Sequence, residues 1–329
     1  MGVSSEASIK QAADILRHGG LVAFPTETVY GLGARAFDEH AVARIFAVKG
    51  RPFDNPLIVH IAHEDQLPLL SSKIPSSARQ LIKAFWPGPL TLVLERSKKL
   101  PALVSAGLST VAVRMPNHPM ALALIHELGE PIAAPSANRS GRISPTSAHH
   151  VQKAFGKNEV MVLDGGPCTV GLESTVLDLT AHPPRILRPG AITEEAIAGV
   201  IGAVTPYSKQ EKMVGSPGLR HVHYAPNLQM ILVASDAWKT VLDQWLLSGK
   251  RIGTITLERA CAIDGEVVAA PVYKKVMIHL TDYAHNLFAS LHEAEATGVE
   301  VLLVEAVLSE GLGIAIMDRL ERGAGDASI

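Results

Sequence analysis

Apolar and polar residues alternate along the first two thirds of this chain in a way that predicts interleaved helices and strands. Residues 7–20 repeat apolar positions at helical spacing and end in two glycines, and the apolar run 21–24 is typical of a buried strand. The alternation continues through a helix at 38–49, strands at 56–61, 91–95 and 110–115, a helix at 119–128 and a strand at 131–135. Interleaving of this kind indicates an α/β domain.

A break in the pattern divides the chain into two domains. Residues 205–228 have little periodicity and mix Pro, Gly, Ser and charged residues, as linkers do. A second α/β pattern follows, beginning with an apolar run and a helix that contains two tryptophans. We therefore predict a first domain over 1–204, a linker over 205–228 and a smaller α/β domain over 229–329.

Composition narrows the class of protein. With 329 residues, 47% of them apolar and only 19% charged, the chain can bury a large core. It has neither an export signal at its N-terminus nor an apolar run long enough to span a membrane, so we expect a cytoplasmic protein without a membrane partner. Cys168 and Cys261 lie far apart and predict neither a disulfide framework nor a zinc site. The net charge of −2 argues against binding a long polyanion.

Two glycine patterns fit the dinucleotide fingerprint G-x-G-x-x-A, "GLGARA" at 31–36 and "GLGIAI" at 311–316. A true fingerprint starts directly after a strand, whereas "PTETVY" separates the first copy from the run 21–24. The second copy lies near the end of the chain without a following strand. We therefore interpret both as ordinary turns.

Small polar and cationic residues gather where strands of the first domain begin or end. Ligand sites in open α/β sheets lie in crevices at strand ends, so these segments are expected to converge on a pocket. Its candidate cations are Lys49, Arg51, Arg114, Arg139, Arg142 and Arg188. The alternative is a set of scattered surface cations, which is plausible for Arg139 and Arg142. For Lys49, Arg51 and Arg188, each beside a rigid Pro or Gly turn, we favour ligand binding.

The sequence carries no motif for covalent or metal catalysis. The patterns G-x-S-x-G and H-E-x-x-H are both absent, and the H-x-H at His221 lacks further metal ligands. His60 lies within an apolar strand, where a single histidine is more often a core residue than a ligand contact. An inventory of cations, hydroxyls and small residues suits the electrostatic positioning of phosphates.

Seven ordered motifs carry a family resemblance: "PTETVYGLG", "KGRP…NPLIVHI", "FWPGPLT", "VAVRMPNHP", "APSANRSG…SPT", "LESTVLDL" and "LRPGAIT". With "SPGLRHVHYAPN" and the second α/β segment, the chain resembles the long, two-domain form of the YrdC-type threonylcarbamoyl-AMP synthases. The resemblance implies an α/β fold with a twisted mixed-sheet YrdC-like catalytic domain and a smaller Rossmann-like domain.

The implied reaction condenses L-threonine, bicarbonate and ATP, with Mg²⁺, to threonylcarbamoyl-AMP and pyrophosphate. Threonylcarbamoyl-transfer proteins then use the product to modify tRNAs that read ANN codons, so contact with tRNA would be indirect or weak.

The resemblance also assigns residues to each substrate. On the threonine side it places Thr28, His60, Arg114, Ala134 and Ser174. On the ATP side it places Arg51, Asn55, Thr110, Ser136, Ser144, Arg188 and Tyr224. Lys49 is an additional phosphate contact, and Lys49 and Arg51 are the catalytic candidates. No residue is assigned to a metal.

Two further expectations concern the linker and Arg51. We expect the linker to fold over the mouth of the pocket, the alternative being a passive tether. We expect Arg51→Ala to reduce turnover and leave the fold intact, because a cation on an exposed turn contributes little to stability. Two rival functions stay open: an RNA-binding module, which would bind with a steep salt dependence and without consuming ATP, and an enzyme that transfers a carbamoyl group from carbamoyl phosphate.

Overall fold

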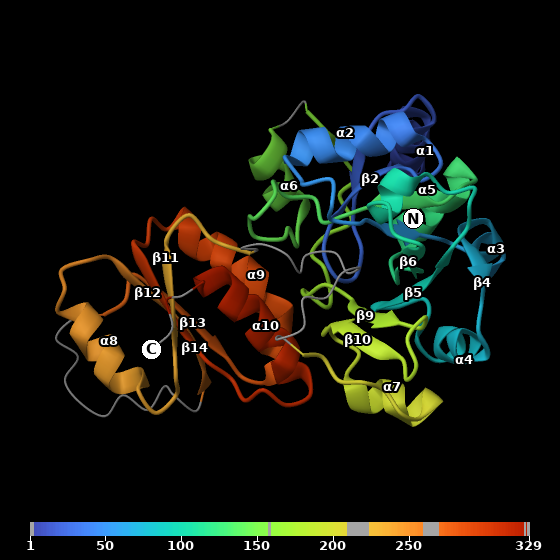
Figure 1. The fold of residues 1–329 in the computed structure, drawn as a ribbon. Coiled ribbons are helices and arrows are strands. Elements are labelled where there is room, and N and C mark those ends of the chain that lie inside the picture. Colours follow the sequence, from blue (N-terminus) through green and yellow to red (C-terminus); the bar gives the residue numbers. More distant parts are fainter. Residues whose placement is uncertain (1–2, 157–158, 209–223, 259–269, 326, 328–329) are drawn as a thin grey trace. The chain divides into compact units, whose positions relative to one another are not determined.

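A computed structural model describes residues 3–156, 159–208, 224–258, 270–325 and 327. The chain divides into two compact units, Met1–Ser140 with Ser144–Arg220 (unit 1) and Gly141–Ile143 with His221–Ile329 (unit 2). Each unit is built on its own sheet (Figure 1). Within the described ranges, no helix is both long and apolar enough to cross a membrane.

Unit 1 contains a ten-stranded mixed sheet in the order β10-β9-β5-β6-β3-β7-β2-β1-β8, with β4 paired to β5. The strands are β1 (Val22–Phe24), β2 (Gly31–Arg35), β3 (Ile58–His60), β4 (Ser71–Lys73), β5 (Leu90–Arg96), β6 (Thr110–Arg114), β7 (Ile132–Ala134), β8 (Met161–Val162), β9 (Thr175–Asp178) and β10 (Arg185–Arg188). Three neighbouring pairs, β1 with β8, β3 with β6 and β5 with β9, are parallel, and the others are antiparallel. The sheet is therefore mixed, as predicted.

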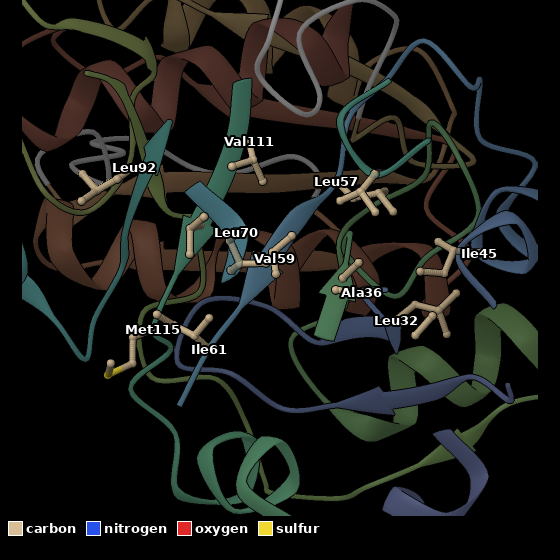
Figure 2. Packing of buried hydrophobic residues seen from close by; sticks show 14 of the residues in the cluster. Leu32, Ala36, Ile45, Leu57, Val59, Ile61, Leu70, Leu92, Val111 and Met115 are labelled. Atoms are coloured by element: carbon tan, nitrogen blue, oxygen red, sulfur yellow. The ribbon is translucent and has the colours of Figure 1, made fainter. Parts of the chain in front are cut away.

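Helices cover this sheet unevenly. They are α1 (Val3–Arg17), α2 (Glu39–Lys49), α3 (Leu67–Leu70), α4 (Ser76–Phe85), α5 (Pro119–Leu128), α6 (Ala148–Phe155) and α7 (Glu194–Ile201), with the 3₁₀ turns η1 (Glu64–Gln66) and η2 (Ala102–Ser105). Residues of α2, α4, α6 and α7 share the largest core cluster with strand residues from one face, among them Leu32, Val59, Leu92 and Val111 (Figure 2). On the opposite face α1 and α5 cover only the part near β1 and β7.

The rest of that opposite face carries a small apolar cluster made of strand residues alone: Ile58, Val93, Ala112, Val176 and Leu187. Tyr207 packs against it. We call this patch the floor, because it lies on the same sheet face as several of the predicted site residues.

The first glycine pattern is a strand, so its interpretation as a turn was wrong. Gly31 and Gly33 belong to β2, which pairs with β1 and β7. A Cβ atom on Gly33 would come within 2.7 Å of Ile132 Cγ2 and 2.9 Å of Phe24 Cε1. Glycine is required here because the neighbouring side chains fill the space above the strand.

Unit 2 contains a four-stranded parallel sheet in the order β11-β14-β12-β13. Its elements are β11 (Gln229–Val233), α8 (Trp238–Leu246), β12 (Ile252–Leu257), β13 (Tyr273–Met277), α9 (Leu280–Ala296), β14 (Val301–Glu305) and α10 (Leu312–Ala324). Helix α8 packs on one face of the sheet, and α9 and α10 pack on the other (Figure 1). The predicted smaller Rossmann-like α/β fold is confirmed.

Candidate active site

Strand register places several predicted residues on one face of the unit 1 sheet. Alternate residues of a strand share a face, and Ile58 of β3 pairs with both Ala112 of β6 and Ala134 of β7. The residues that lie on this face together with the apolar floor are Thr110, His60, Arg114 and Ala134. Because β3 and β6 are parallel, His60 and Arg114 form a register pair at their carboxyl ends, and Thr110 lies at the amino end of β6.

Arg114 is the centre of a buried polar network. Its Nη2 lies 2.5 Å from Oε2 of Glu27, its Nη1 donates to Thr28 Oγ1 at 2.9 Å, and its Nε donates to the Gly88 carbonyl oxygen at 3.1 Å. The side chains of Arg114 and Glu27 are only 3% and 4% exposed. Since the buried carboxylate balances the charge, the guanidinium is held in one orientation.

The sequence analysis did not predict Glu27, although it belongs to the motif "PTETVYGLG". Among the described residues, its Oε1 has no hydrogen-bond partner. A buried carboxylate oxygen with an open acceptor site is unusual and marks a position where a ligand can donate. The available signal was an acidic residue placed between two threonines directly after a buried strand.

His60 is a neutral, buried imidazole. Burial and the neighbouring Arg114 charge lower its pKa to about 3. Its ring lies edge-on to Phe24 with centroids 5.7 Å apart, and Nδ1 has no hydrogen-bond partner among the described residues. His60 therefore packs as a core residue and also presents a polar atom to which no described residue hydrogen-bonds.

Lys49 ties the end of α2 to the loop after β7. Asp38 caps the helix at its start, and Gly50 ends it in the left-handed conformation at φ 63°. The Lys49 Nζ donates to the carbonyl oxygen of Ser136 at 2.5 Å and also to that of Asn138. Burial, followed by the positive charges of Arg51 and Arg139, holds the pKa of Lys49 well below its usual value. An anion bound beside it would favour its ammonium form.

Arg51 and Asn55 close the turn before β3. Arg51 Nε donates to the Asn55 carbonyl oxygen at 3.1 Å, and Nη2 donates to Asn55 Oδ1 at 2.6 Å and to the Pro56 carbonyl oxygen at 2.8 Å. Arg51 is only 6% exposed. The expectation that it lies on an exposed turn was wrong, because its guanidinium folds back onto the turn that it organises.

Ser174 and Arg188 form a second buried cluster beside the floor. Arg188 donates from Nε and Nη2 to the Ser174 carbonyl oxygen, at 3.1 and 3.0 Å, and from Nη2 to Ser174 Oγ at 3.2 Å. Ser174 Oγ is also 2.7 Å from Thr91 Oγ1. One residue assigned to threonine and one assigned to ATP are thus in direct contact. Nearby in the sequence, Glu173 accepts a hydrogen bond from Ser144 at 2.6 Å.

Two family models match most of the chain. The Sua5, YciO and YrdC model, described as "Telomere recombination", matches residues 14–190, and the model described as "Threonylcarbamoyl-AMP synthase, C-terminal domain" matches residues 192–325. The chain belongs to the Sua5/YrdC family. The resemblance inferred from the seven motifs is thereby confirmed.

Relatives in this Sua5/YrdC family match over nearly their full length. The threonylcarbamoyl-AMP synthase of Pyrococcus abyssi is 46% identical, over 97% of this chain and 95% of that protein. The Bacillus subtilis threonylcarbamoyl-AMP synthase is 42% identical, over 98% and 94%. The crystal structure of P. abyssi Sua5 complexed with L-threonine matches with a TM-score of 0.90 at 45% identity, over 98% of this chain and 96% of that chain.

Tyr224 and the linker stand apart from the other site predictions for this family member. Tyr224 belongs to unit 2, where it adopts φ 67° and packs against Phe288, with ring centroids 5.2 Å apart, and under the Arg319 guanidinium at 5.8 Å. Residues 209–223, which include most of the predicted closing segment, lie outside the described residues. The ATP role of Tyr224 and closure by the linker stay predictions.

Proposed function

We propose that this chain condenses L-threonine, bicarbonate and ATP to threonylcarbamoyl-AMP, with release of pyrophosphate and water. The names of its full-length relatives support this reaction, and so does the L-threonine complex of P. abyssi Sua5. In the proposed chemistry the threonine amine and bicarbonate lose water to give a carbamate. A carbamate oxygen then attacks the α-phosphorus, and the bond to the pyrophosphate oxygen breaks.

The observation that carries the proposal is the arrangement of polar groups at the two ends of one apolar floor. Thr28, His60 and Arg114 meet at the carboxyl ends of β3 and β6, whereas Asn55 and Thr110 lie toward their amino ends. The four residue steps of β6 span about 13 Å at the usual rise per residue. A ligand lying along this floor would therefore have its amino-acid end and its nucleotide end in different polar surroundings.

Each substrate is assigned residues on this basis. Threonine would be held by Thr28, His60, Arg114, Ala134 and Ser174. ATP would be held by Lys49, Arg51, Asn55, Thr110, Ser136, Ser144, Arg188 and Tyr224. The contact between Ser174 and Arg188 supports a reaction centre where the two sets meet.

The residues at this face favour charge stabilisation over covalent catalysis. The carbamate is itself the nucleophile, so the protein has to hold the reactants and balance the negative charge that develops on phosphate oxygens. Lys49, Arg51 and Arg188 are suited to that task. Cys168, the cysteine within the described ranges, is buried, and burial raises the pKa of its thiol to about 12. It would therefore stay protonated and unreactive near neutral pH.

Mg²⁺ would enter with the nucleotide. In the part of the chain that the structure describes, no group of three His, Cys, Asp or Glu side chains is arranged to hold a metal ion. Mg²⁺ bound to ATP takes most of its ligands from phosphate and water oxygens, and it adds only one or two carboxylates. The described residues therefore fit an ion that is carried into the site by ATP.

The product would be consumed by threonylcarbamoyl-transfer proteins that modify adenosine in tRNAs reading ANN codons. A mixed anhydride of a carbamate and AMP is an activated acyl donor, so an acceptor amine on the tRNA base completes the transfer. Contact of this chain with tRNA would be indirect or weak.

The test measures pyrophosphate release and threonylcarbamoyl-AMP by mass spectrometry, with threonine, bicarbonate or ATP withheld in turn. Both signals should require all three substrates. Pyrophosphate release without threonine would refute the proposal, as would a carbamoyl-adenylate formed from carbamoyl phosphate and ATP in the absence of threonine and bicarbonate. RNA binding with a steep salt dependence and no ATP consumption would support the RNA-binding alternative.

A further inference from the structure

Unit 2 contains a cavity of about 830 Å³ at the carboxyl edge of its parallel sheet. It is lined by residues that end or directly follow all four strands: Ala234, Ser235 and Asp236 after β11, Leu257 of β12, Ile278, His279, Leu280 and Thr281 after β13, and Glu305, Ala306, Val307 and Leu308 from β14 onward. The volume is within the range of sites for small molecules.

The cavity lies at a switch point of the sheet topology. Strands β11 and β14 are parallel neighbours, and Val233 pairs with Glu305 at their carboxyl ends. From there the chain leaves β11 toward α8 on one face and leaves β14 toward α10 on the other (Figure 1). The two loops diverge and open a crevice, which is where open α/β sheets bind their ligands.

The glycine pattern at 311–316 supports one wall of the cavity. Gly311 has φ 50° and precedes α10, and a Cβ atom on Gly313 would collide with the Leu308 carbonyl oxygen. These glycines let the loop 306–308 fold closely onto the start of α10. They are not part of the cavity lining, so the pattern builds the pocket wall and does not act as a pyrophosphate-binding fingerprint.

The charged groups of the lining select against phosphate. Among the described lining residues, Asp236 and Glu305 are the carboxylates, and neither Lys nor Arg occurs. Glu305 is 3% exposed, and its oxygens accept from Ser235 Oγ at 2.9 Å and from the Leu257 amide at 2.8 Å. Each carboxylate oxygen has a second lone pair, so a ligand hydroxyl can still donate to it. A ligand phosphate would meet the negative charge of these two carboxylates.

Another part of the lining is apolar, and two of its side chains are exposed. Ile278 is 61% exposed and Leu308 is 73% exposed, and both line the cavity together with Leu257 and Val307. Large aliphatic side chains held open at the mouth of a pocket suit the faces of a flat, apolar ring.

We propose that this cavity binds a nucleoside without phosphate, and that it is a second ligand site independent of the proposed active site in unit 1. The ribose hydroxyls donate to Asp236 and Glu305, and the base lies between Ile278 and Leu308. A ligand of this chemistry combines the diol that the carboxylates can accept from with the flat ring that the rim can cover.

The experiment uses the full chain, labelled at Ile and Leu methyl groups, with adenosine as the probe. Spectra are recorded with saturating ATP, so that the proposed unit 1 site is occupied. The methyl signals of Ile278 and Leu308 are identified from Ile278→Val and Leu308→Val variants. Adenosine should shift both signals saturably and leave the Leu247 methyl signals unchanged, because Leu247 is exposed in unit 2 but outside the cavity.

Matched ligands test the role of the ribose diol and the effect of a phosphate, and matched variants test whether the ligand binds in the cavity. Removing the ribose diol, in 2′,3′-dideoxyadenosine, should weaken binding about tenfold or more, since hydrogen bonds to charged groups are lost. AMP should bind at least about tenfold more weakly than adenosine because of the carboxylates. Leu308→Arg should abolish the Ile278 shift, and Leu247→Arg, at a similarly exposed site, should preserve it.

Three outcomes would overturn the proposal. The first is the absence of any Ile278 or Leu308 shift up to the solubility limit of adenosine. The second is equal affinity for the dideoxy analogue, and the third is AMP binding as tightly as adenosine. Thermal melting of each variant confirms that it is folded.

Discussion

The buried pair of Glu27 and Arg114 makes a strong prediction about stability. Glu27→Gln keeps the side-chain volume and removes the negative charge that lies 2.5 Å from the guanidinium. Both side chains are almost fully buried, so Arg114 would be left as an uncompensated charge in the protein interior. Losing one partner of a buried pair costs about 3–5 kcal/mol, and we expect about 3 kcal/mol because Arg114 keeps its hydrogen bonds to Thr28 and to the Gly88 carbonyl oxygen.

A double-mutant cycle separates the interaction energy between Glu27 and Arg114 from the other effects of each substitution. Arg114→Met alone leaves the Glu27 carboxylate buried without a cation, so it should cost a similar amount. The double variant contains no buried charge here, and its loss of unfolding free energy should fall short of the sum of the two by about 2–3 kcal/mol. The subadditive part measures the interaction itself.

The assay needs a signal from unit 1 alone. The chain has three tryptophans, of which Trp86 lies in unit 1, and Trp238 and Trp245 lie in α8 of unit 2. Replacing the latter two by Phe leaves Trp86 fluorescence as the reporter of urea unfolding. The matched control is Glu130→Gln, which breaks the pair with Arg35 at the same 2.5 Å separation but at 23% and 31% exposure. It should cost about 0–1 kcal/mol.

The reasoning would be refuted if the losses of unfolding free energy in the two single variants simply added in the double variant. It would also be refuted if Glu27→Gln lost no more unfolding free energy than Glu130→Gln. A folded Glu27→Gln protein should also show a raised KM for threonine with a smaller effect on the KM for ATP. That split tests whether the pair positions Arg114 for the amino acid.

Three further predictions concern single residues. In the unfolded chain His60 binds a proton at the usual histidine pKa near 6.5, whereas in the folded protein its pKa is about 3, so the free energy of unfolding should fall by about 2 kcal/mol between pH 7 and pH 5. Urea unfolding of His60→Gln should lack this part of the pH dependence. The same dependence of unfolding free energy on pH in His60→Gln and in the wild type would contradict the prediction. Arg51→Ala should lower product formation by about a hundredfold or more and also destabilise unit 1 by about 1–3 kcal/mol, because three hydrogen bonds are lost; wild-type turnover would remove Arg51 from the site. At a pH above the lowered pKa of Lys49, ATP binding should be accompanied by the uptake of a proton, which calorimetry in buffers of different ionisation enthalpy would measure. The same proton uptake in Lys49→Arg would show that another group takes the proton.

Local signals in the sequence were enough to predict most helices. Asp38 and Gly50 mark both ends of α2, and the predicted helix at 119–128 has the bounds of α5. Such signals depend on neighbours in the chain, so the sequence alone carries them. The site residues were assigned through the family resemblance, because they belong to short motifs that can be recognised along the chain.

Features that depend on distant parts of the chain were missed. Strand β2 looked like a turn because its glycines are explained only by Phe24 and Ile132 packing over them. Strand β13 was not predicted, since it lies at the edge of its sheet and two lysines break its apolar pattern. Glu27 was overlooked because its partner Arg114 is 87 positions away in the sequence.

Four buried cations in the described part of unit 1 each donate a hydrogen bond to a main-chain carbonyl oxygen: Lys49, Arg51, Arg114 and Arg188. These contacts join motifs that are far apart in the sequence, as when Lys49 fixes the loop at Ser136. Carbonyl dipoles compensate a buried positive charge only in part, and Glu27 is the carboxylate that completes the compensation for Arg114. For Lys49, whose charged form is disfavoured by burial and by the charges of Arg51 and Arg139, a phosphate of ATP would supply the counter-charge, so nucleotide binding would stabilise this arrangement.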